Sequence, residues 1–167
     1  DFPAEIRAPA GTINGVSSFQ VHISDHDITT PGDEPNVLVA MNPAALRSEL
    51  GRLEPGGTII ANEDAFDERN LDKVDYGTNP LDDGSLATYR VIKVPMSSLT
   101  REVCEPLGVK PRDAERSKNF FALGLVSFMY TRPIEPTLEW IDEKFAKNPQ
   151  VQAANREALL AGYHYGE

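Results

Sequence analysis

The strongest constraint on the fold is a compact strand–helix–strand pattern in residues 37–61. Residues 37–41 are continuously apolar, which is typical of a strand that is covered on both faces. Asn42-Pro43 then provides a cap and a first helical residue, so a short helix through Leu50 is expected. Residues 58–61 form a second apolar run. Two strands joined in this way are expected to run parallel, with a right-handed crossover between them.

Two further strands are predicted on either side of this unit. Residues 18–24 alternate between apolar and polar side chains, which indicates a strand with one buried face, antiparallel or at an edge. Its apolar members are Phe19, Val21 and Ile23. Residues 87–94 are predicted to form another strand, which Pro95 ends.

The second half of the chain is predicted to be helical. Leu99, Val103 and Leu107 recur every four residues and form one apolar stripe. Residues 119–130 are apolar nearly all round, so this helix must be buried in the domain or against a partner. A further helix is expected to start near Pro136, and the last one is expected over residues 149–161.

Gly162 is a plausible C-terminal cap of that last helix. Together the elements predict a single α/β domain of the Rossmann-like, three-layer type. Its sheet would be mixed and partly parallel, and its C-terminal portion would be helical.

Composition and charge exclude several functions. The formal net charge of −10, with no run rich in lysine and arginine, argues against a nucleic-acid partner. Cys104 is the single cysteine, so the chain cannot form an internal disulfide or hold an iron–sulfur cluster alone. This cysteine usage fits the cytoplasm. No apolar run approaches the roughly 20 residues that span a membrane, so no membrane association is expected.

Familiar catalytic motifs are missing from the sequence. There is no Gly-rich dinucleotide fingerprint, phosphate-binding loop, serine elbow or zinc-ligand spacing, so no catalytic residue and no metal site is predicted. His22, His26 and His164 are scattered, and His22 is expected to be a solvent-facing polar residue. Cys104 is expected to be a packed thiol.

Three local features could bind a ligand. Residues 3–12 contain Glu5 and Arg7, and the guanidinium of Arg7 could bind a carboxylate or a phosphate. An ordinary surface ion pair between Glu5 and Arg7 is the alternative. Asn42 and Asn62 each follow a strand of the parallel pair, at the sheet edge where α/β folds bind ligands; helix cap and turn residue are the alternatives. Residues 116–119 place two cations, Arg116 and Lys118, before the apolar helix. Such cations at a helix start either bind an anion, such as a phosphate or carboxylate, or are simply solvated.

Taken together, these segments resemble the gamma domain of 2-oxoacid:ferredoxin oxidoreductases. The resemblance covers essentially the whole chain, and the 2-oxoglutarate branch is the most similar. The matching motifs are residues 2–12 (FPAEIRAPAGT), 15–22 (GVSSFQVH), 39–46 (VAMNPAAL), 56–60 (GGTII), 116–124 (RSKNFFALG), 143–147 (EKFAK) and 161–166 (AGYHYG). Residues 1–167 are thus expected to be one gamma-type domain that lacks the family's opening strand, Gly-rich loop and helix. Residues 8–9 are Ala-Pro where other branches carry Gly-Gly.

The resemblance implies a part of an enzyme that is inactive by itself. The complete enzyme would decarboxylate a 2-oxoacid oxidatively, transfer the acyl group to coenzyme A and reduce ferredoxin. Thiamine diphosphate and iron–sulfur clusters would belong to the remaining alpha-subunit domains and the beta subunit, which are the expected partners. The residues expected near coenzyme A are Glu5, Arg7, Gly11, Thr12, Asn42 and Asn119.

Two other functions also fit the sequence. A purely structural gamma domain would fill a subunit interface and touch no ligand. A free-standing nucleotide-binding α/β domain would bind its ligand without any partner, although the sequence contains no Gly-rich loop to support it.

Overall fold

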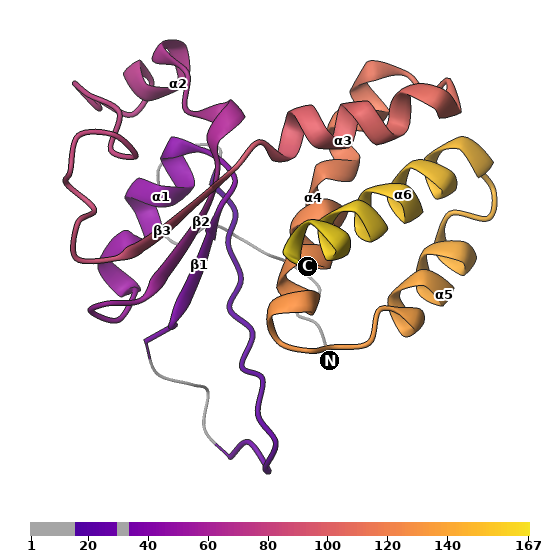
Figure 1. Ribbon diagram of the computed structural model, residues 1–167, viewed down its shortest axis with the longest axis horizontal. Helices are drawn as coiled ribbons and strands as arrows, with labels where there is room; N and C mark the ends of the chain where they lie inside the picture. The colour runs from indigo at the N-terminus through magenta and orange to yellow at the C-terminus, as the bar shows by residue number, and fades with distance from the viewer. Residues whose placement is uncertain (1–15, 30–33) are drawn as a thin grey trace. The chain divides into compact units, whose positions relative to one another are not determined.

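The computed structural model describes residues 16–29 and 34–167. The chain divides into two compact units, a sheet unit that ends at Val94 and a helical unit from Pro95 to Glu167 (Figure 1). The α/β class and the helical C-terminal portion are confirmed.

The sheet unit contains three parallel strands in the order β1-β2-β3. They are β1 (Val37–Ala40), β2 (Thr58–Asn62) and β3 (Arg90–Val94). Between β1 and β2 lie α1 (Pro43–Glu49) and the 3-10 turn η1 (Leu50–Arg52), and β2 leads into η2 (Glu63–Ala65) and α2 (Glu68–Asp72). The predicted strand–helix–strand unit and its parallel pairing are therefore confirmed.

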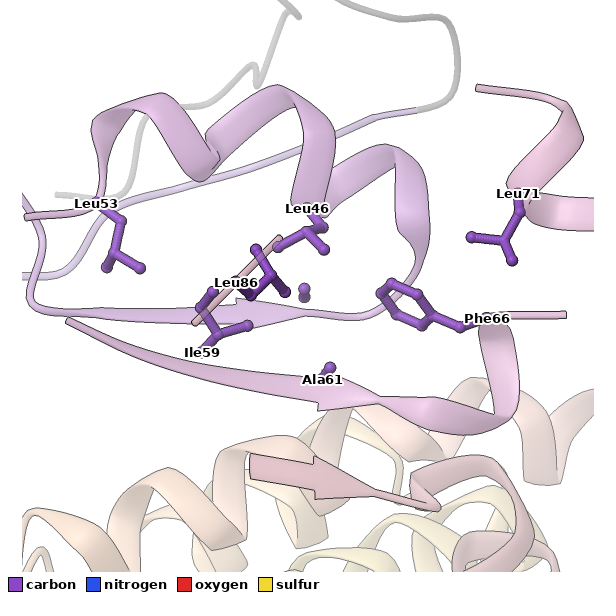
Figure 2. Packing of buried hydrophobic residues seen from close by; sticks show 8 residues of the cluster. Leu46, Leu53, Ile59, Ala61, Phe66, Leu71 and Leu86 are labelled. Carbon is purple, nitrogen blue, oxygen red and sulfur yellow. The ribbon is translucent and has the colours of Figure 1, made fainter. Parts of the chain in front are cut away.

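One face of this sheet carries the core of the unit. Strand residues Ile59 and Ala61 point to the same side because side chains alternate along a strand. Leu46 of α1 and Leu71 of α2 pack there, so both helices cover this face (Figure 2). The buried members of the cluster are Ala40, Leu46, Leu53, Ile59, Ala61, Phe66, Leu71 and Leu86.

The prediction of a strand at residues 18–24 is wrong. The described segment forms no ladder, and its apolar side chains are exposed, with Phe19 at 78% and Val21 at 61%. Alternation specifies which face a strand would bury, but a strand also needs a neighbour to pair its backbone. In the described sheet β1 and β3 each pair only with β2, and residues 18–24 pair with none of the three strands.

The helical unit begins directly after Pro95, which ends β3 as expected. It contains α3 (Met96–Cys104), η3 (Glu105–Leu107), α4 (Pro111–Met129), α5 (Glu135–Lys144) and α6 (Pro149–Gly166). The apolar stripe predicted from Leu99 to Leu107 thus spans α3 and η3. None of the described helices is long and apolar enough to cross a membrane.

Helices α4 and α6 pack with their backbones in unusually close contact. A Cβ atom added at Gly124 would lie 2.1 Å from the Leu159 carbonyl oxygen, and one at Gly162 would lie 1.9 Å from that of Phe121. Ser117 Oγ, buried in the same interface, donates a hydrogen bond of 2.7 Å to Asn155 Oδ1.

The predicted C-terminal cap at Gly162 is therefore wrong. Helix α6 continues to Gly166, and Gly162 lies in its interior. The absence of a side chain serves close helix–helix approach at this position, which is the second common use of glycine.

Candidate functional site

Most of the residues expected near coenzyme A lie outside the described part of the chain. These residues are Glu5, Arg7, Gly11 and Thr12. Asn42 is described within the sheet unit and Asn119 within the helical unit. The structure therefore shows the surroundings of these two asparagines separately.

Asn42 lies just beyond the carboxyl end of β1 and caps helix α1. Its backbone is extended, and its Oδ1 accepts a hydrogen bond of 2.8 Å from the Ala45 backbone N–H. Pro43 follows as the first helical residue, where a missing N–H costs nothing. The predicted helix-cap role of Asn42 is confirmed, and its contact with a ligand stays a prediction.

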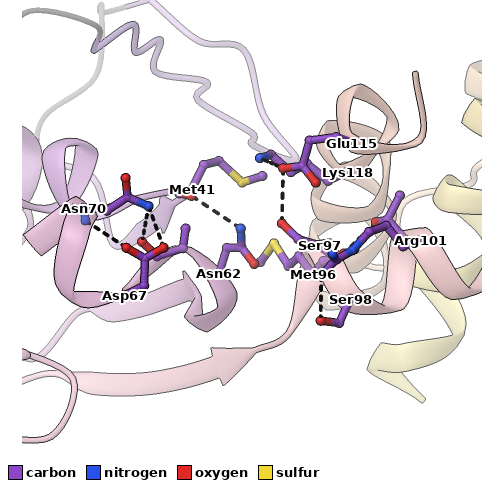
Figure 3. A network of polar contacts seen from close by, with 12 residues as sticks. Met41, Asn62, Asp67, Asn70, Met96, Ser97, Ser98, Arg101, Glu115 and Lys118 are labelled. Atoms are coloured by element: carbon purple, nitrogen blue, oxygen red, sulfur yellow. Dashed lines mark hydrogen bonds and ion pairs between the residues drawn. The ribbon is translucent and has the colours of Figure 1, made fainter. Parts of the chain in front are cut away.

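Asn62 is the last residue of β2 and is completely buried. Its Nδ2 lies 3.5 Å from the backbone carbonyl oxygen of Met41, so the amide reaches from the end of β2 to the chain that leaves β1 (Figure 3). Asn62 also precedes the 3-10 turn η2, as the turn interpretation predicted, but its side chain does not cap that turn. A buried amide needs hydrogen-bond partners, and this one joins the two strand ends at the predicted edge of the sheet.

The chain that follows β2 makes this edge acidic. Residues 63–68 contain four carboxylates and no cation. Asp67 caps α2, since its side chain accepts hydrogen bonds from the Asn70 backbone N–H (2.9 Å) and from Asn70 Nδ2 (3.0 Å; Figure 3). A coenzyme phosphate at this edge would need a cation from another segment to offset these charges.

Asn119 is exposed and lies well inside helix α4, so the helix start predicted there is wrong. The helix begins at Pro111, and Asp113 occupies its first turn. The cations that suggested an anion at a helix end lie instead along the helix. Arg116 is 3.9 Å from Asp113, and Lys118 forms an ion pair with Glu115 (Figure 3).

The charged side chains before Asn119 thus form ordinary ion pairs between residues three positions apart on the helix surface. The assignment of Asn119 to the coenzyme A site rests on the family resemblance alone and stays a prediction. The signal that identifies the true helix start is Pro111 at its first position, with Asp113 in the first turn.

Cys104 is a packed thiol, as predicted. Its side chain is fully buried, and Sγ lies 3.8 Å from the Ala154 carbonyl oxygen. Burial, assisted by the negative charge of Glu157, raises the pKa of this thiol. His22 is exposed, as expected for a surface residue. Across residues 16–29 and 34–167, no three His, Cys, Asp or Glu side chains are grouped so as to hold a metal ion.

Removing the Asn42 side chain tests its structural role. Asn42→Ala should lower the free energy of unfolding by about 1 kcal/mol, because the Ala45 N–H loses its acceptor. Asn42→Asp keeps an acceptor oxygen and should unfold at nearly the wild-type urea concentration. Urea titration measures both variants. Equal destabilisation of the two would contradict the capping role of the Asn42 side chain.

Comparison with known proteins places the chain in a family. Residues 1–165 match the model of the pyruvate ferredoxin/flavodoxin oxidoreductase family. The chain belongs to the pyruvate ferredoxin/flavodoxin oxidoreductase family. Within it, the chain is similar to the 2-oxoglutarate oxidoreductase subunit KorA of Mycobacterium tuberculosis, with 54% identity over all 167 residues. It spans only 26% of the length of that relative. No solved structure matches the chain.

The family assignment confirms the resemblance that the sequence motifs indicated. For this pyruvate ferredoxin/flavodoxin oxidoreductase family member, the described residues bring Asn42 and Asn62 to one sheet edge. Sequence reasoning missed the buried role of Asn62 and the close packing at Gly124. Both depend on long-range contacts that no local motif specifies.

Proposed function

We propose that the chain is one part of a 2-oxoglutarate:ferredoxin oxidoreductase and helps to form its coenzyme A site. The observation that carries this proposal is the 54% identity, over the whole chain, to the KorA subunit. The complete enzyme would convert the 2-oxoacid to an acyl-coenzyme A and pass electrons to ferredoxin. By itself the chain would be inactive.

The cofactors of the reaction would be held elsewhere in the complex. Thiamine diphosphate and an iron–sulfur cluster, which supply the decarboxylation and electron-transfer chemistry, would lie in the other alpha-subunit domains and the beta subunit. The chain's one thiol, Cys104, is fully buried and does not fit as a cluster ligand.

The contribution of the chain would be to position coenzyme A. Arg7 offers a planar guanidinium fork that suits a phosphate, and Gly11 allows a close approach of the backbone. The acidic segment 63–68 and the net charge of −10 disfavour a polyanion in general. Binding of coenzyme A would therefore depend strongly on the local cation, Arg7.

Replacement of Arg7 tests this role. Arg7→Ala should raise the apparent KM for coenzyme A at least about tenfold in the assembled enzyme, because a charge-assisted hydrogen bond contributes roughly 1.5–3 kcal/mol. The KM for 2-oxoglutarate should stay within about twofold, since Arg7 is not expected to touch the 2-oxoacid. Steady-state kinetics with each substrate varied in turn measures both values.

Two further variants make the result specific. Arg7→Lys keeps the charge without the fork and should show an intermediate KM for coenzyme A. Arg112→Ala removes an exposed cation of α4 and should leave both KM values unchanged. Equal increases for both substrates in Arg7→Ala would contradict the coenzyme role. Weaker subunit assembly in place of a KM effect would favour a purely structural domain.

A further inference from the structure

Three aromatic rings meet where helices α4 and α5 of the helical unit come together. The ring centroids of Phe120 and Trp140 are 6.3 Å apart, and each lies 6.1 Å from the centroid of Phe145. These distances are typical of packed aromatic pairs. Phe120 and Phe145 are half-buried, whereas the Trp140 side chain remains 49% exposed.

Leu123 extends this patch along α4. It follows Phe120 by three residues and therefore lies within about 60° of it around the helix. Its side chain is 42% exposed. We call Phe120, Leu123, Trp140 and Phe145 the aromatic surface. Large apolar side chains that are exposed next to one another are typical of interaction sites.

The rim of the aromatic surface is charged, with Lys144 at the end of α5 as well as carboxylates. Glu139 and Glu143 are exposed on α5 beside Trp140, and the described part of the structure gives neither of them an ion-pair partner. Asp142 on the same helix is already paired with Arg156, at 2.5 Å. An apolar centre with a charged, solvent-exposed rim is typical of a protein–protein interface.

We propose that the aromatic surface binds another domain of a longer, KorA-like polypeptide of which this chain would be one part. The length of the KorA relative supports this occupant, since about three-quarters of that relative lies outside the matching region. Trp140 would be the central anchor, because buried tryptophan is enriched among residues that dominate binding energy. The inference rests on the chain's being part of a KorA-like polypeptide, and it is independent of the coenzyme A site.

Oxidative footprinting of the full-length protein tests whether the surface is covered. Hydroxyl radicals modify exposed side chains, and mass spectrometry gives the oxidation rate of Trp140 in the native and the urea-unfolded protein. A half-exposed indole should react about twofold more slowly in the native state, whereas a covered anchor should react at least about tenfold more slowly. Tyr165 of α6, which is 46% exposed, provides the internal reference. A Trp140 rate reduced only as much as that of Tyr165 would overturn the proposal.

Chemical cross-linking identifies the occupant. Two lysines flank Phe145 of the aromatic surface in the sequence: Lys144, the last residue of α5, and Lys147. We expect links from these lysines to residues of the same polypeptide outside the present chain. In a mixture of ¹⁴N- and ¹⁵N-labelled protein, mixed-isotope links would instead show a second copy. Those links, or links to another subunit only, would contradict the assigned occupant.

A pair of matched variants connects the protection of Trp140 to the surface itself. Leu123→Glu places a charge on the apolar part of the surface and should raise the oxidation rate of Trp140 at least about fivefold. Met129→Glu is the control: Met129 is 37% exposed and follows Phe120 by nine residues, about 180° around the same helix. An equal rise in both variants would show that the effect is not specific to the surface.

The same measurement separates this inference from the coenzyme proposal. Arg7→Ala should change the KM for coenzyme A and leave the oxidation rate of Trp140 unaltered. If Arg7→Ala has no kinetic effect while Trp140 is protected, the coenzyme role fails and the interface stands. If Trp140 is reactive while the KM effect is present, the interface fails and the coenzyme role stands.

Discussion

Gly162→Ala is expected to lower the free energy of unfolding of the helical unit by about 2–3 kcal/mol. The new Cβ would overlap the Phe121 carbonyl oxygen, to which an ideal Cβ lies only 1.9 Å away. Because the obstacle is backbone rather than a flexible side chain, α4 and α6 must move apart. This cost exceeds the gain of about 1 kcal/mol that alanine brings to a helix interior.

Urea unfolding monitored by tryptophan fluorescence measures this effect. Trp140 is the only tryptophan of the chain and belongs to the helical unit, so its emission reports on the unit that is changed. Gly124→Ala, whose Cβ would lie 2.1 Å from the Leu159 carbonyl oxygen across the same crossing, should lower the midpoint in the same way. A wild-type midpoint for Gly162→Ala would contradict the close α4–α6 packing.

Leu46→Ala should cost the sheet unit about 3 kcal/mol. Leu46 is fully buried and packs in the cluster that includes Ile59 and Phe66 (Figure 2). The loss combines the transfer free energy of the removed methyl groups with the cavity that they leave behind, and such changes typically cost 2–5 kcal/mol. The hydrogen exchange of the β2 amides should become faster in Leu46→Ala, by an amount that reflects this loss of unfolding free energy.

Leu123→Ala is the matched control for Leu46→Ala within the 167-residue chain. It makes the same chemical change at a side chain that is 42% exposed, and it should cost less than about 1 kcal/mol. Equal losses from the two leucines would mean that Leu46 does not occupy a packed core.

Local sequence signals were sufficient for the parallel unit at residues 37–62. A continuous apolar run, an Asn-Pro helix start and a second apolar run each act over a few residues, and all three agree. The cap at Asn42 was predictable for the same reason, since an N-cap residue contacts a backbone group three positions away.

Features that depend on distant partners could not be predicted in this way. Gly162 fits a helix end as well as a helix crossing, and only the position of α4 decides between them. Residues 18–24 have the alternation of a strand, but pairing requires a neighbour that no local pattern specifies. The buried contact of Asn62 with the Met41 carbonyl likewise depends on the register of β1 and β2.

The start of α4 was missed for a different reason. Its first turns carry Asp113, Glu115, Arg116 and Lys118, so they show no apolar period to reveal a helix. The predicted boundary was therefore placed where the apolar residues begin, at Asn119. Pro111 and Asp113 were the available signals, because proline and an acidic residue favour the first turn of a helix.

Titration of coenzyme A into the assembled full-length enzyme tests the proposed function most directly. Isothermal calorimetry should show saturable binding to the wild-type complex and at least about tenfold weaker binding to Arg7→Ala, as expected when a charge-assisted phosphate contact is lost. Identical binding isotherms for the wild type and Arg7→Ala, in a complex shown to be active, would contradict the claim that this chain helps to form the coenzyme A site.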